Sequence, residues 1–351
     1  MLPPIAKRVK ARFRRTLKHH PTLLPPDASL LVAVSGGQDS LCLLQLLLWL
    51  KEKYHWQLQV GHCDHRWRSD SRANADHVAQ TCQQWGVECH LATAEQIPKS
   101  EAEARAWRYQ ALTEIATAQH CTHLVTGHTK SDRAETMIYN LVRGSGLDGL
   151  TAMAWSRPLT DKITLVRPLL EISRQETGEF CQTLTLPVYI DSTNLQMQYR
   201  RNRIRQELIP YLAQHFNPQV ESALWQTAEL LQADYSFLEA TARQFWQGHD
   251  LNAFCLDRTA LQSQPLALQR RIIKQFLSYH WHPHQQVDFS QVEKLRHLLT
   301  APHRSQTDPL WGRYIAVVEQ NYICLVQIIS SSRLDYGKNH PHDHRHGGTG
   351  N

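Results

Sequence analysis

The segment VAVSGGQDSLCLLQLLL, residues 32–48, is the most informative part of this sequence. An apolar run ends at Val34, the loop Ser35–Ser40 follows with two adjacent glycines, and a long apolar pattern of helical type then begins. Glycines let backbone N–H groups approach an anion, and the first turn of a helix carries a partial positive charge. A strand, this loop and a helix in that order predict a phosphate-binding loop, with a plain glycine turn as the alternative.

The loop lacks the lysine that helps the common phosphate-binding loop to transfer a γ-phosphoryl group. If the loop holds the β- and γ-phosphates of ATP together, pyrophosphate becomes the leaving group and AMP passes to an oxygen of the substrate. Ser35 and Ser40 offer hydroxyl donors to the phosphates. Asp39 would repel them unless a cation lies between, which predicts a Mg²⁺ ion held in part by Asp39.

Further apolar runs alternate with helical patterns along the first half of the chain. We predict strands at residues 30–34, 58–62, 87–91, 123–127 and 163–166, followed in turn by helices at 40–53, 70–85, 101–119, 132–142 and 173–184. This alternation indicates an α/β domain with a parallel sheet and helices on both faces. Ligands bind beyond the carboxyl ends of such strands, so we expect residues 35–40, 63–68 and 128–136 to meet.

The pattern changes near Asn217-Pro218, where we place a domain boundary. Residues 1–215 form the α/β domain, and residues 216–330 form a smaller, mostly helical α+β domain. Its expected elements are helices at 220–247, 266–279 and 289–299 and two strands, 313–318 and 322–328, joined by a turn at Gln320-Asn321. Residues 331–351 are a polar, His-rich tail with a composition typical of disorder.

Composition excludes several classes of protein. The chain of 351 residues is 42% hydrophobic and 20% charged, and no apolar run reaches the roughly 18 residues that a membrane span needs. The eight cysteines include no CxxC pair, which argues against a zinc ribbon or an iron–sulfur cluster. We expect reduced cysteines in a cytoplasmic protein.

The net charge of +6 permits a nucleic-acid partner, and two basic clusters are more specific. Residues 1–20 hold seven Lys and Arg and no acid, which favours a structured, RNA-facing helix over an organelle transit peptide. YRRNRIR, residues 199–205, holds four arginines, of which Arg201 and Arg205 share one helical face. Arginine suits phosphates and flat bases, whereas a solvated charged face is the alternative.

Segments spread over about residues 28–212 resemble, in order, the motifs of the tRNA(Ile)-lysidine synthetases. SGGQDS matches the SGGxDS loop of the N-type ATP pyrophosphatases, or PP-loop enzymes, to which that family belongs. Similar to the family's HxDHxLR, EAxAREWRY, GHHxDDQxET and LxRGxGxxGL are HCDHRWR (62–68), EAEARAWRY (101–109), TGHTKSDRAET (126–136) and LVRGSGLDGL (141–150). RPLL (167–170), DSTN (191–194) and YRRNRIRQELIP (199–210) complete the series.

The resemblance implies a ligase that forms a C–N bond. ATP adenylates the 2-oxygen of the wobble cytidine in an isoleucine tRNA with a CAU anticodon, and free L-lysine displaces AMP. The product, lysidine, changes decoding from AUG to AUA. The resemblance also implies ATP and Mg²⁺ as requirements, a domain that contacts tRNA in the second half, and a fold that permits a homodimer.

The residues that the resemblance and the chemistry single out form three groups. The expected ATP-binding residues are those of the loop: Ser35, Gly36, Gly37, Gln38, Asp39 and Ser40. The expected catalytic residues are Asp39, Arg108, His128, Asp132 and Glu135, with Asp39 and Asp132 as Mg²⁺ ligands. The expected contacts to tRNA or phosphate are Arg143, Arg201 and Arg205.

Asp132 and Glu135 are spaced i,i+3 at the start of a helix, so both carboxylates can face one site. They either hold Mg²⁺ or attract the lysine ammonium and later take its proton; the alternative for Asp132 is to complement the helix dipole. Arg108 would meet the α-phosphate or the base, or else form a surface ion pair.

The sequence departs from the family pattern at Thr129, Ser131 and Arg133, which replace a histidine, an aspartate and a glutamine. One carboxylate is lost and one positive charge is gained beside the expected metal. Two other functions stay open at this point. A tRNA-thiolating enzyme would use the same adenylation with a sulfur carrier, and a non-catalytic tRNA-binding protein would have kept only the fold.

Overall fold

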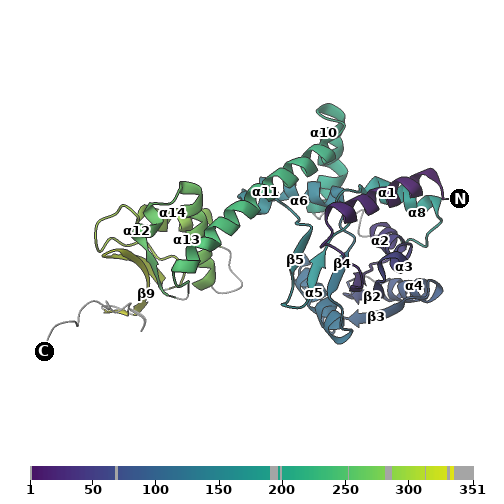
Figure 1. Ribbon diagram of the computed structural model, residues 1–351, viewed down its shortest axis with the longest axis horizontal. Helices are drawn as coiled ribbons and strands as arrows, with labels where there is room; N and C mark the ends of the chain where they lie inside the picture. Colours follow the sequence, from purple (N-terminus) through teal and green to yellow (C-terminus); the bar gives the residue numbers. More distant parts are fainter. Residues whose placement is uncertain are drawn as a thin grey trace. The chain divides into compact units, whose positions relative to one another are not determined.

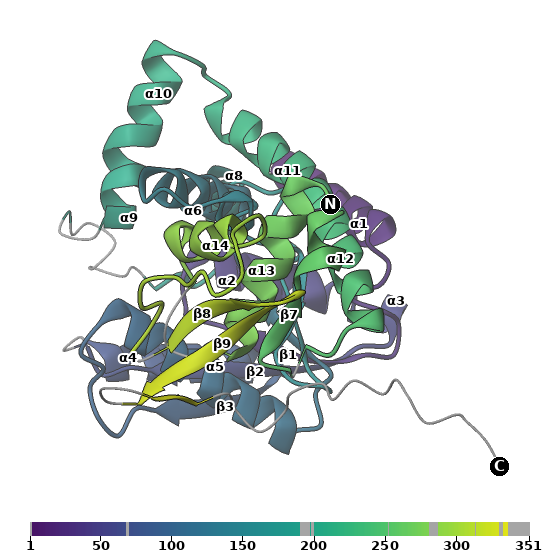
Figure 2. The same ribbon diagram turned by 90° about the vertical axis from the view of Figure 1, so that its left-hand side faces the viewer.

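The computed structural model describes residues 2–67, 70–189, 197, 200–251, 253–280, 287–312, 314–329 and 333–335. The chain divides into two compact units, Met1–Gln232 and Ala233–Asn351 (Figures 1 and 2). The DSTN segment and the tail, apart from residues 333–335, lie outside the described residues. Among the described helices, none has both the length and the apolar character that crossing a membrane requires.

The first unit is built on a six-stranded sheet in the order β3-β2-β1-β4-β6-β5. Its parallel strands are β1 (Ser29–Ala33), β2 (Gln57–Asp64), β3 (Glu88–Thr93), β4 (His123–Thr126) and β6 (Thr164–Val166). The predicted parallel sheet is therefore confirmed. The edge strand β5 (Ser156–Pro158) pairs antiparallel with β6 and was not predicted, because its three exposed residues show no apolar pattern.

Helices cover both faces of this sheet because side chains of a strand alternate between the two faces. Leu30 and Val32 of β1 pack into the cluster with α2, α4 and α8, whereas Leu31 packs with Leu112 of α5 on the opposite face. The helices of this part are α1 (Pro4–His19), α2 (Gln38–Leu48), α3 (Lys51–Tyr54), α4 (Ser71–Gln84), α5 (Glu101–Ala118), α6 (Lys130–Val142), α7 (Leu147–Leu150) and α8 (Arg174–Thr183).

The basic N-terminal segment forms helix α1, which packs on α8 (Figure 1). Val9 and Phe13 of α1 are buried in the main core. Basic side chains of α1 pair with acidic side chains of α8. Arg12 donates to the Glu176 carboxylate at 2.7 Å, and Arg8 lies 3.6 Å from the carboxylate of Glu179. Arg12 and Arg8 of α1 thus pair with acids of α8 within the same unit.

Residues 200–205 of the YRRNRIR segment lie on a continuous helical rod made of α9 (Arg200–Arg203), the π-helix η2 (Ile204–Leu208) and α10 (Ile209–His215). Pro210 has no N–H to donate to the carbonyl of Gln206, and its ring crowds that carbonyl. A wider π turn just before Pro210 relieves both conflicts. Ile209 is buried with Ile138 of α6, which fixes the rod against the α/β core.

The long helix α11 (Val220–Phe245) belongs to both units, so the division falls inside it at residue 232 rather than at the expected 215. The reason is packing: Val220 and Leu224 contact the apolar cluster of α6 and α10. Leu238 and Ala242 belong to the core of the second unit. Asn217-Pro218 marks a turn between two helices of the first unit, not the domain boundary.

The second unit combines helices α12 (Arg258–Gln262), α13 (Leu266–His280) and α14 (Phe289–His297) with an antiparallel sheet. Strands β8 (Tyr314–Glu319) and β9 (Tyr322–Ile329) form the predicted hairpin, in which Gln320 has a positive φ of 49°. Two short strands were not predicted: β7 (Cys255–Asp257) and β10 (Arg333–Asp335), which both pair with β9. The predicted combination of a parallel α/β domain and a smaller α+β domain is confirmed.

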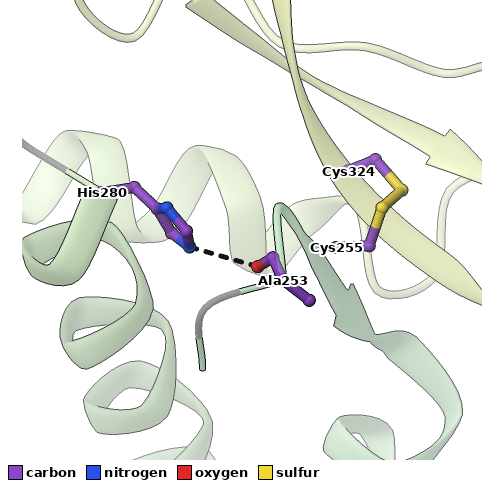
Figure 3. The surroundings of a disulfide bond; sticks show 4 residues. All are labelled: Ala253, Cys255, His280 and Cys324. Carbon is purple, nitrogen blue, oxygen red and sulfur yellow. Dashed lines mark hydrogen bonds between the residues drawn. A yellow bond between two sulfur atoms is a disulfide. The ribbon is translucent and has the colours of Figure 1, made fainter. Parts of the chain in front are cut away.

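A disulfide joins Cys255 of β7 to Cys324 of β9 in the second unit (Figure 3). The two residues are direct partners in the strand register, which brings their Cα atoms to 4.0 Å. The expectation that every cysteine is reduced is therefore wrong for this pair. The two cysteines are 69 residues apart in the sequence, so their pairing could not be predicted without the sheet that brings them together.

Candidate functional site

A cavity of about 1120 Å³ lies beyond the carboxyl ends of β1, β2 and β4 in the first unit. Its lining includes residues from each of the three segments expected to meet there: Ser35, Asp39 and Ser40 after β1, His65 and Trp67 after β2, and His128 and Asp132 after β4. Arg108, Arg174, Arg201 and Arg205 also line it. One cavity therefore brings the phosphate-type loop together with the Asp39 and Asp132 carboxylates and these arginines.

The loop Ser35–Ser40 is closed by its own serines. The Ser40 hydroxyl accepts a hydrogen bond from the Ser35 backbone N–H at 3.2 Å and donates to the Gly37 carbonyl at 2.9 Å. Gly36 has a positive φ of 84°, and a Cβ there would lie 2.6 Å from Asn74 Oδ1. Glycine is required at this position for both reasons.

Asn74 of α4 is a residue of the site that sequence reasoning missed. Its side-chain Nδ2 donates to the Ser35 carbonyl at 3.1 Å and so holds the start of the loop. Its Oδ1 is buried without a hydrogen-bond partner in the described part of the chain. The pattern RANAD offered only a polar residue on an amphipathic helix, so nothing local marked Asn74.

Asp39, at the start of α2, contacts α8 rather than the loop. Arg174 Nη1 donates to Asp39 Oδ2 at 2.7 Å, and the Thr177 hydroxyl donates to Oδ1. Burial raises the pKa of Asp39, the Arg174 charge lowers it, and the nearby Asp132 carboxylate raises it. The net shift is upward, and Arg174 is the counter-charge that opposes the effect of burial.

Arg174 was also missed from the sequence, although one signal was available. It is the first residue of α8 after strand β6, and a cation at a helix N-terminus opposes the helix dipole. Such a charge needs a partner, here Asp39. Gln38 supports the same contact, since its Nε2 donates to the Arg174 carbonyl at 2.6 Å, so its side chain is directed to α8.

Asp132 is the third residue of α6 and forms a capping box with Thr129. The Thr129 backbone N–H and hydroxyl both donate to Asp132 Oδ2 at 2.8 Å. The net shift of the Asp132 pKa is downward. Burial raises this pKa, but the combined effect of His128, the two hydrogen bonds from Thr129 and the Arg205 charge lowers it by more. Asp132 therefore stabilises the helix and also presents a charged carboxylate to the cavity.

His128 Nδ1 and the Thr126 hydroxyl oxygen are joined by a hydrogen bond of 2.9 Å. Burial lowers the pKa of His128 to about 3, with Arg167, Arg105 and Arg108 acting in the same direction and Asp132 against it. The ring is therefore neutral at physiological pH and acts as a hydrogen-bonding group rather than as a charged acid.

Glu135 faces Arg205, one helix turn along from Asp132. Arg205 Nε and Nη2 donate to the two carboxylate oxygens of Glu135 at 2.6 and 2.8 Å, and Nη2 lies 3.5 Å from Asp132 Oδ1. Burial raises the pKa of Glu135 although Arg205 opposes the shift. The two carboxylates thus meet at one arginine that the sequence assigned to RNA or phosphate.

A second, smaller cavity of about 330 Å³ adjoins this arginine. Arg174 and Arg205 line both cavities, so they form the wall that the two share. Glu135 and Glu221 line only the smaller one. It therefore offers two carboxylates and two guanidinium groups around a space suited to a small zwitterion.

The three departures from the family pattern have structural roles away from the larger cavity. Thr129 is the N-cap of α6. The Ser131 hydroxyl donates to Glu221 at 2.8 Å and accepts from the Arg174 backbone N–H at 3.1 Å. Arg133 is completely buried and pairs with Glu229 of α11. The added positive charge is therefore neutralised within the fold, and Arg133 does not line the cavity that holds Asp39 and Asp132.

The remaining expected residues divide into two groups. Arg201 and Arg205 both line the larger cavity, as their shared helical face predicted, and Arg108 does so from α5, where its Nε donates to His65 Nε2 at 3.1 Å. Arg143 does not belong to the cavity lining. It is exposed at the end of α6, with its guanidinium 5.3 Å from the Tyr139 ring centre.

The residues present fit a Mg²⁺ ion that is held mainly by phosphates. Among the described residues, no group of three or more His, Cys, Asp and Glu side chains has the arrangement of a metal site. Asp39 and Asp132 line the same cavity, and Asp132 raises the pKa of Asp39 by repulsion, which a cation between them would relieve. Mg²⁺ commonly binds one or two carboxylates together with substrate phosphates.

Comparisons with known proteins agree on one family. The family model of the PP-loop domain matches residues 5–212. The chain is 52% identical to a tRNA(Ile)-lysidine synthase from Nostoc sp., over 90% of this chain and 96% of that protein. It is 51% identical to one from Synechocystis sp., over 84% and 90% of the two chains. A chloroplastic tRNA(Ile)-lysidine synthase from Zygnema circumcarinatum is 35% identical, over 78% and 76%.

Among solved structures, the U34-tRNA thiolase NcsA from Methanococcus maripaludis is similar in fold. Its TM-score is 0.56, its sequence identity is 18%, and the match covers 65% of this chain and 79% of the thiolase. A similarity at this identity shows a shared fold and no more.

Proposed function

This chain belongs to the tRNA(Ile)-lysidine synthase family of PP-loop proteins, and we propose that it joins free lysine to C2 of the wobble cytidine of an isoleucine tRNA with a CAU anticodon. The observation that carries the proposal is that residues of the SGGQDS loop, the Asp132 carboxylate and several arginines line one cavity, among them Arg108, Arg174, Arg201 and Arg205. ATP is the activating substrate.

The reaction has two steps. The cytosine 2-oxygen attacks the α-phosphorus of ATP, the bond to the β-phosphate breaks, and pyrophosphate leaves. The lysine ε-amine then attacks C2, and the C2–O bond breaks, so that AMP leaves with the former 2-oxygen. The lysine ε-ammonium group loses one proton to become the attacking amine, and the nitrogen bonded to C2 loses a second proton as AMP leaves.

The PP-loop supports the first step. Its backbone N–H groups and serine hydroxyls are suited to hold the β- and γ-phosphates as one leaving group. Arg108 and Arg201 line the same cavity, where cationic groups would offset the negative charge that develops at the α-phosphate. Asp39 and Asp132 would hold Mg²⁺, which neutralises phosphate charge when bound. Arg174 lowers the pKa of Asp39 and so favours the charged form that a Mg²⁺ ligand needs.

The smaller cavity is the position that we assign to lysine in the second step. Glu135 and Glu221 would attract the lysine ammonium group. Arg174 and Arg205, which pair with Asp39 and Glu135 in this structure, would supply positive charge for the lysine carboxylate. Glu135 lines this cavity, and burial raises its pKa, which makes it suited to accept a proton from lysine.

One assay tests the function. The protein is incubated with ATP, labelled lysine and unmodified isoleucine tRNA bearing a CAU anticodon. We expect one lysine incorporated for each AMP and pyrophosphate released. The lack of incorporation, with sulfur transfer when a donor is supplied, would favour a thiolating enzyme; tRNA binding with neither activity would favour a non-catalytic protein.

The thiolation alternative has less support from the residues of the site. Cys63 lines the larger cavity, and burial raises its pKa to about 12, so its thiol stays protonated at neutral pH. Sulfur carriers act as thiolates.

We also propose a cytoplasmic location and a role of the second unit in tRNA contact. The resemblance permits a homodimer. Sedimentation of the full chain with and without tRNA measures the oligomeric state, and a monomer throughout would exclude the dimer.

A further inference from the structure

Trp67 is a large aromatic side chain that stays partly uncovered at the larger cavity. It follows β2, lines the cavity, and is 41% exposed. Its indole Nε1 donates to the Pro98 carbonyl at 2.6 Å, which satisfies the polar edge of the ring. The indole is therefore held in place while a large part of its surface is open to a ligand.

A chain of contacts connects Trp67 to the catalytic part of the cavity. The His65 ring centre lies 6.0 Å from that of Trp67 and 5.2 Å from that of Trp107. Arg108 in turn donates to His65 at 3.1 Å. Trp67 thus belongs to a supported aromatic cluster, unlike an isolated surface tryptophan.

Exposed basic side chains share the cavity with Trp67. Arg66, Lys99 and Arg108 are exposed there, whereas of the acids Asp64, Asp70 and Glu101 in the same lining only Glu101 is exposed. An aromatic surface with basic side chains around it is the arrangement with which proteins bind single-stranded nucleic acid: bases stack on the ring, and the cations contact the phosphates.

The proposed function requires such a contact. A cytidine whose 2-oxygen reaches the PP-loop must leave the base stack, and its neighbours on both sides then lose a stacking partner. We propose that Trp67 stacks with a base next to the target cytidine and so holds the anticodon loop at the cavity. This inference rests on the proposed function and names a positioning residue for it.

The lysidine synthetase motif has leucine at the position of Trp67, as HCDHRWR and HxDHxLR show. Leucine packs on a base but has no aromatic face. The stacking contact is therefore a property of this chain and not of the motif. Adenine of ATP is the other base in the reaction, and the experiment separates the two.

The experiment compares wild type with Trp67→Leu and Trp67→Phe. Affinity is measured for an anticodon stem-loop RNA that carries 2-aminopurine on one or the other side of the target cytidine. The fluorescence of 2-aminopurine falls when it stacks on an aromatic ring. ATP affinity is measured separately. We expect Trp67→Leu to bind the RNA about 5- to 150-fold more weakly, the range of one lost stacking contact. Trp67→Phe should restore most of the affinity, and ATP binding should not change.

Trp107→Phe is the matched control, because it keeps an aromatic ring beside His65 and Trp107 does not line the cavity. RNA affinity in this variant should equal that of wild type. Unchanged RNA affinity in Trp67→Leu would overturn the proposal, as would a selective loss of ATP affinity.

Thermal unfolding verifies that each variant is folded. If Trp67→Leu does not fold, the quenching of 2-aminopurine by wild type and by Trp67→Phe decides whether Trp67 stacks on the RNA. Lysine incorporation is scored in parallel. If wild type binds the RNA without incorporating lysine, the proposed function fails, but the comparison of affinities still decides the role of Trp67. If wild type does not bind the RNA, both proposals are wrong.

Discussion

Arg174 donates to Asp39 across the cavity wall, with its Nη1 2.7 Å from Oδ2, and this contact joins the start of α8 to the start of α2. The ion pair connects α8, which follows β6, to α2, which follows the PP-loop. Because both side chains are partly buried, the contact holds the loop and the Asp39 carboxylate in one arrangement before ATP binds.

Replacement of Arg174 with glutamine should impair adenylation by about 100-fold, as expected for one misplaced group in a site of this kind. Burial already raises the pKa of Asp39, and Arg174 lowers it, so loss of the arginine raises that pKa further. The acidic limb of the pH–rate profile should move to higher pH. Arg174→Lys is the control, and an unmoved limb in Arg174→Gln would contradict the assigned role.

Replacement of Asp39 with alanine should abolish adenylation and leave tRNA affinity nearly unchanged. The carboxylate serves the ATP side of the cavity, whereas RNA contact is assigned to arginines such as Arg201. Pyrophosphate release and tRNA binding are measured on the same preparation. Turnover that survives in this variant would remove Asp39 from the mechanism.

Glu229→Ala should lower the free energy of unfolding by about 3–5 kcal/mol, because it leaves the completely buried Arg133 without a counter-charge. Arg133→Gln together with Glu229→Gln should cost much less, since neither charge is then buried. Denaturant unfolding of the single and double variants measures the coupling. Additive losses in that cycle would mean that the pair does not act as a unit.

Reduction of the Cys255–Cys324 disulfide should destabilise the second unit by about 2–4 kcal/mol, since the bond closes a long loop in the unfolded chain. Thermal unfolding with and without a reductant measures the effect. Cys324→Ser should melt like the reduced wild type and show no response to reductant. Cys121→Ser is a control, because Cys121 is a free cysteine of the first unit.

Stability should fall as the pH drops from about 6.5 towards 4, in part through His65. Burial, followed by Arg108 and His62, lowers the pKa of His65 from 6.5 to about 4. A histidine that is kept neutral in the fold stabilises it above the unfolded pKa, and this contribution is lost as pH falls through that range. His65→Gln should show a smaller loss between pH 6.5 and 4 in urea unfolding, and an equal loss would exclude His65 as a cause.

Local features of the sequence were sufficient for the parallel sheet, the PP-loop, the hairpin at Gln320 and the family, because periodicity, glycine placement and motif order depend only on neighbouring residues. Because ligand sites lie beyond the carboxyl ends of parallel strands, the strand positions were also enough to place Ser35, His65 and His128 at one cavity. Short elements such as β5 and β7 escaped, since three residues carry too little pattern to mark a strand.

The pairing of charges depends on contacts between distant parts of the chain. Asp39 and Arg174 are 135 residues apart, and Arg205 is 70 residues from Glu135. The sequence assigned Asp39 to ATP and Mg²⁺, Glu135 to catalysis and Arg205 to tRNA or phosphate, and it did not mark Arg174 at all. A buried charge takes the nearest opposite charge that the fold provides, and only the packing of α2, α6, α8 and the α9–α10 rod determines which one that is.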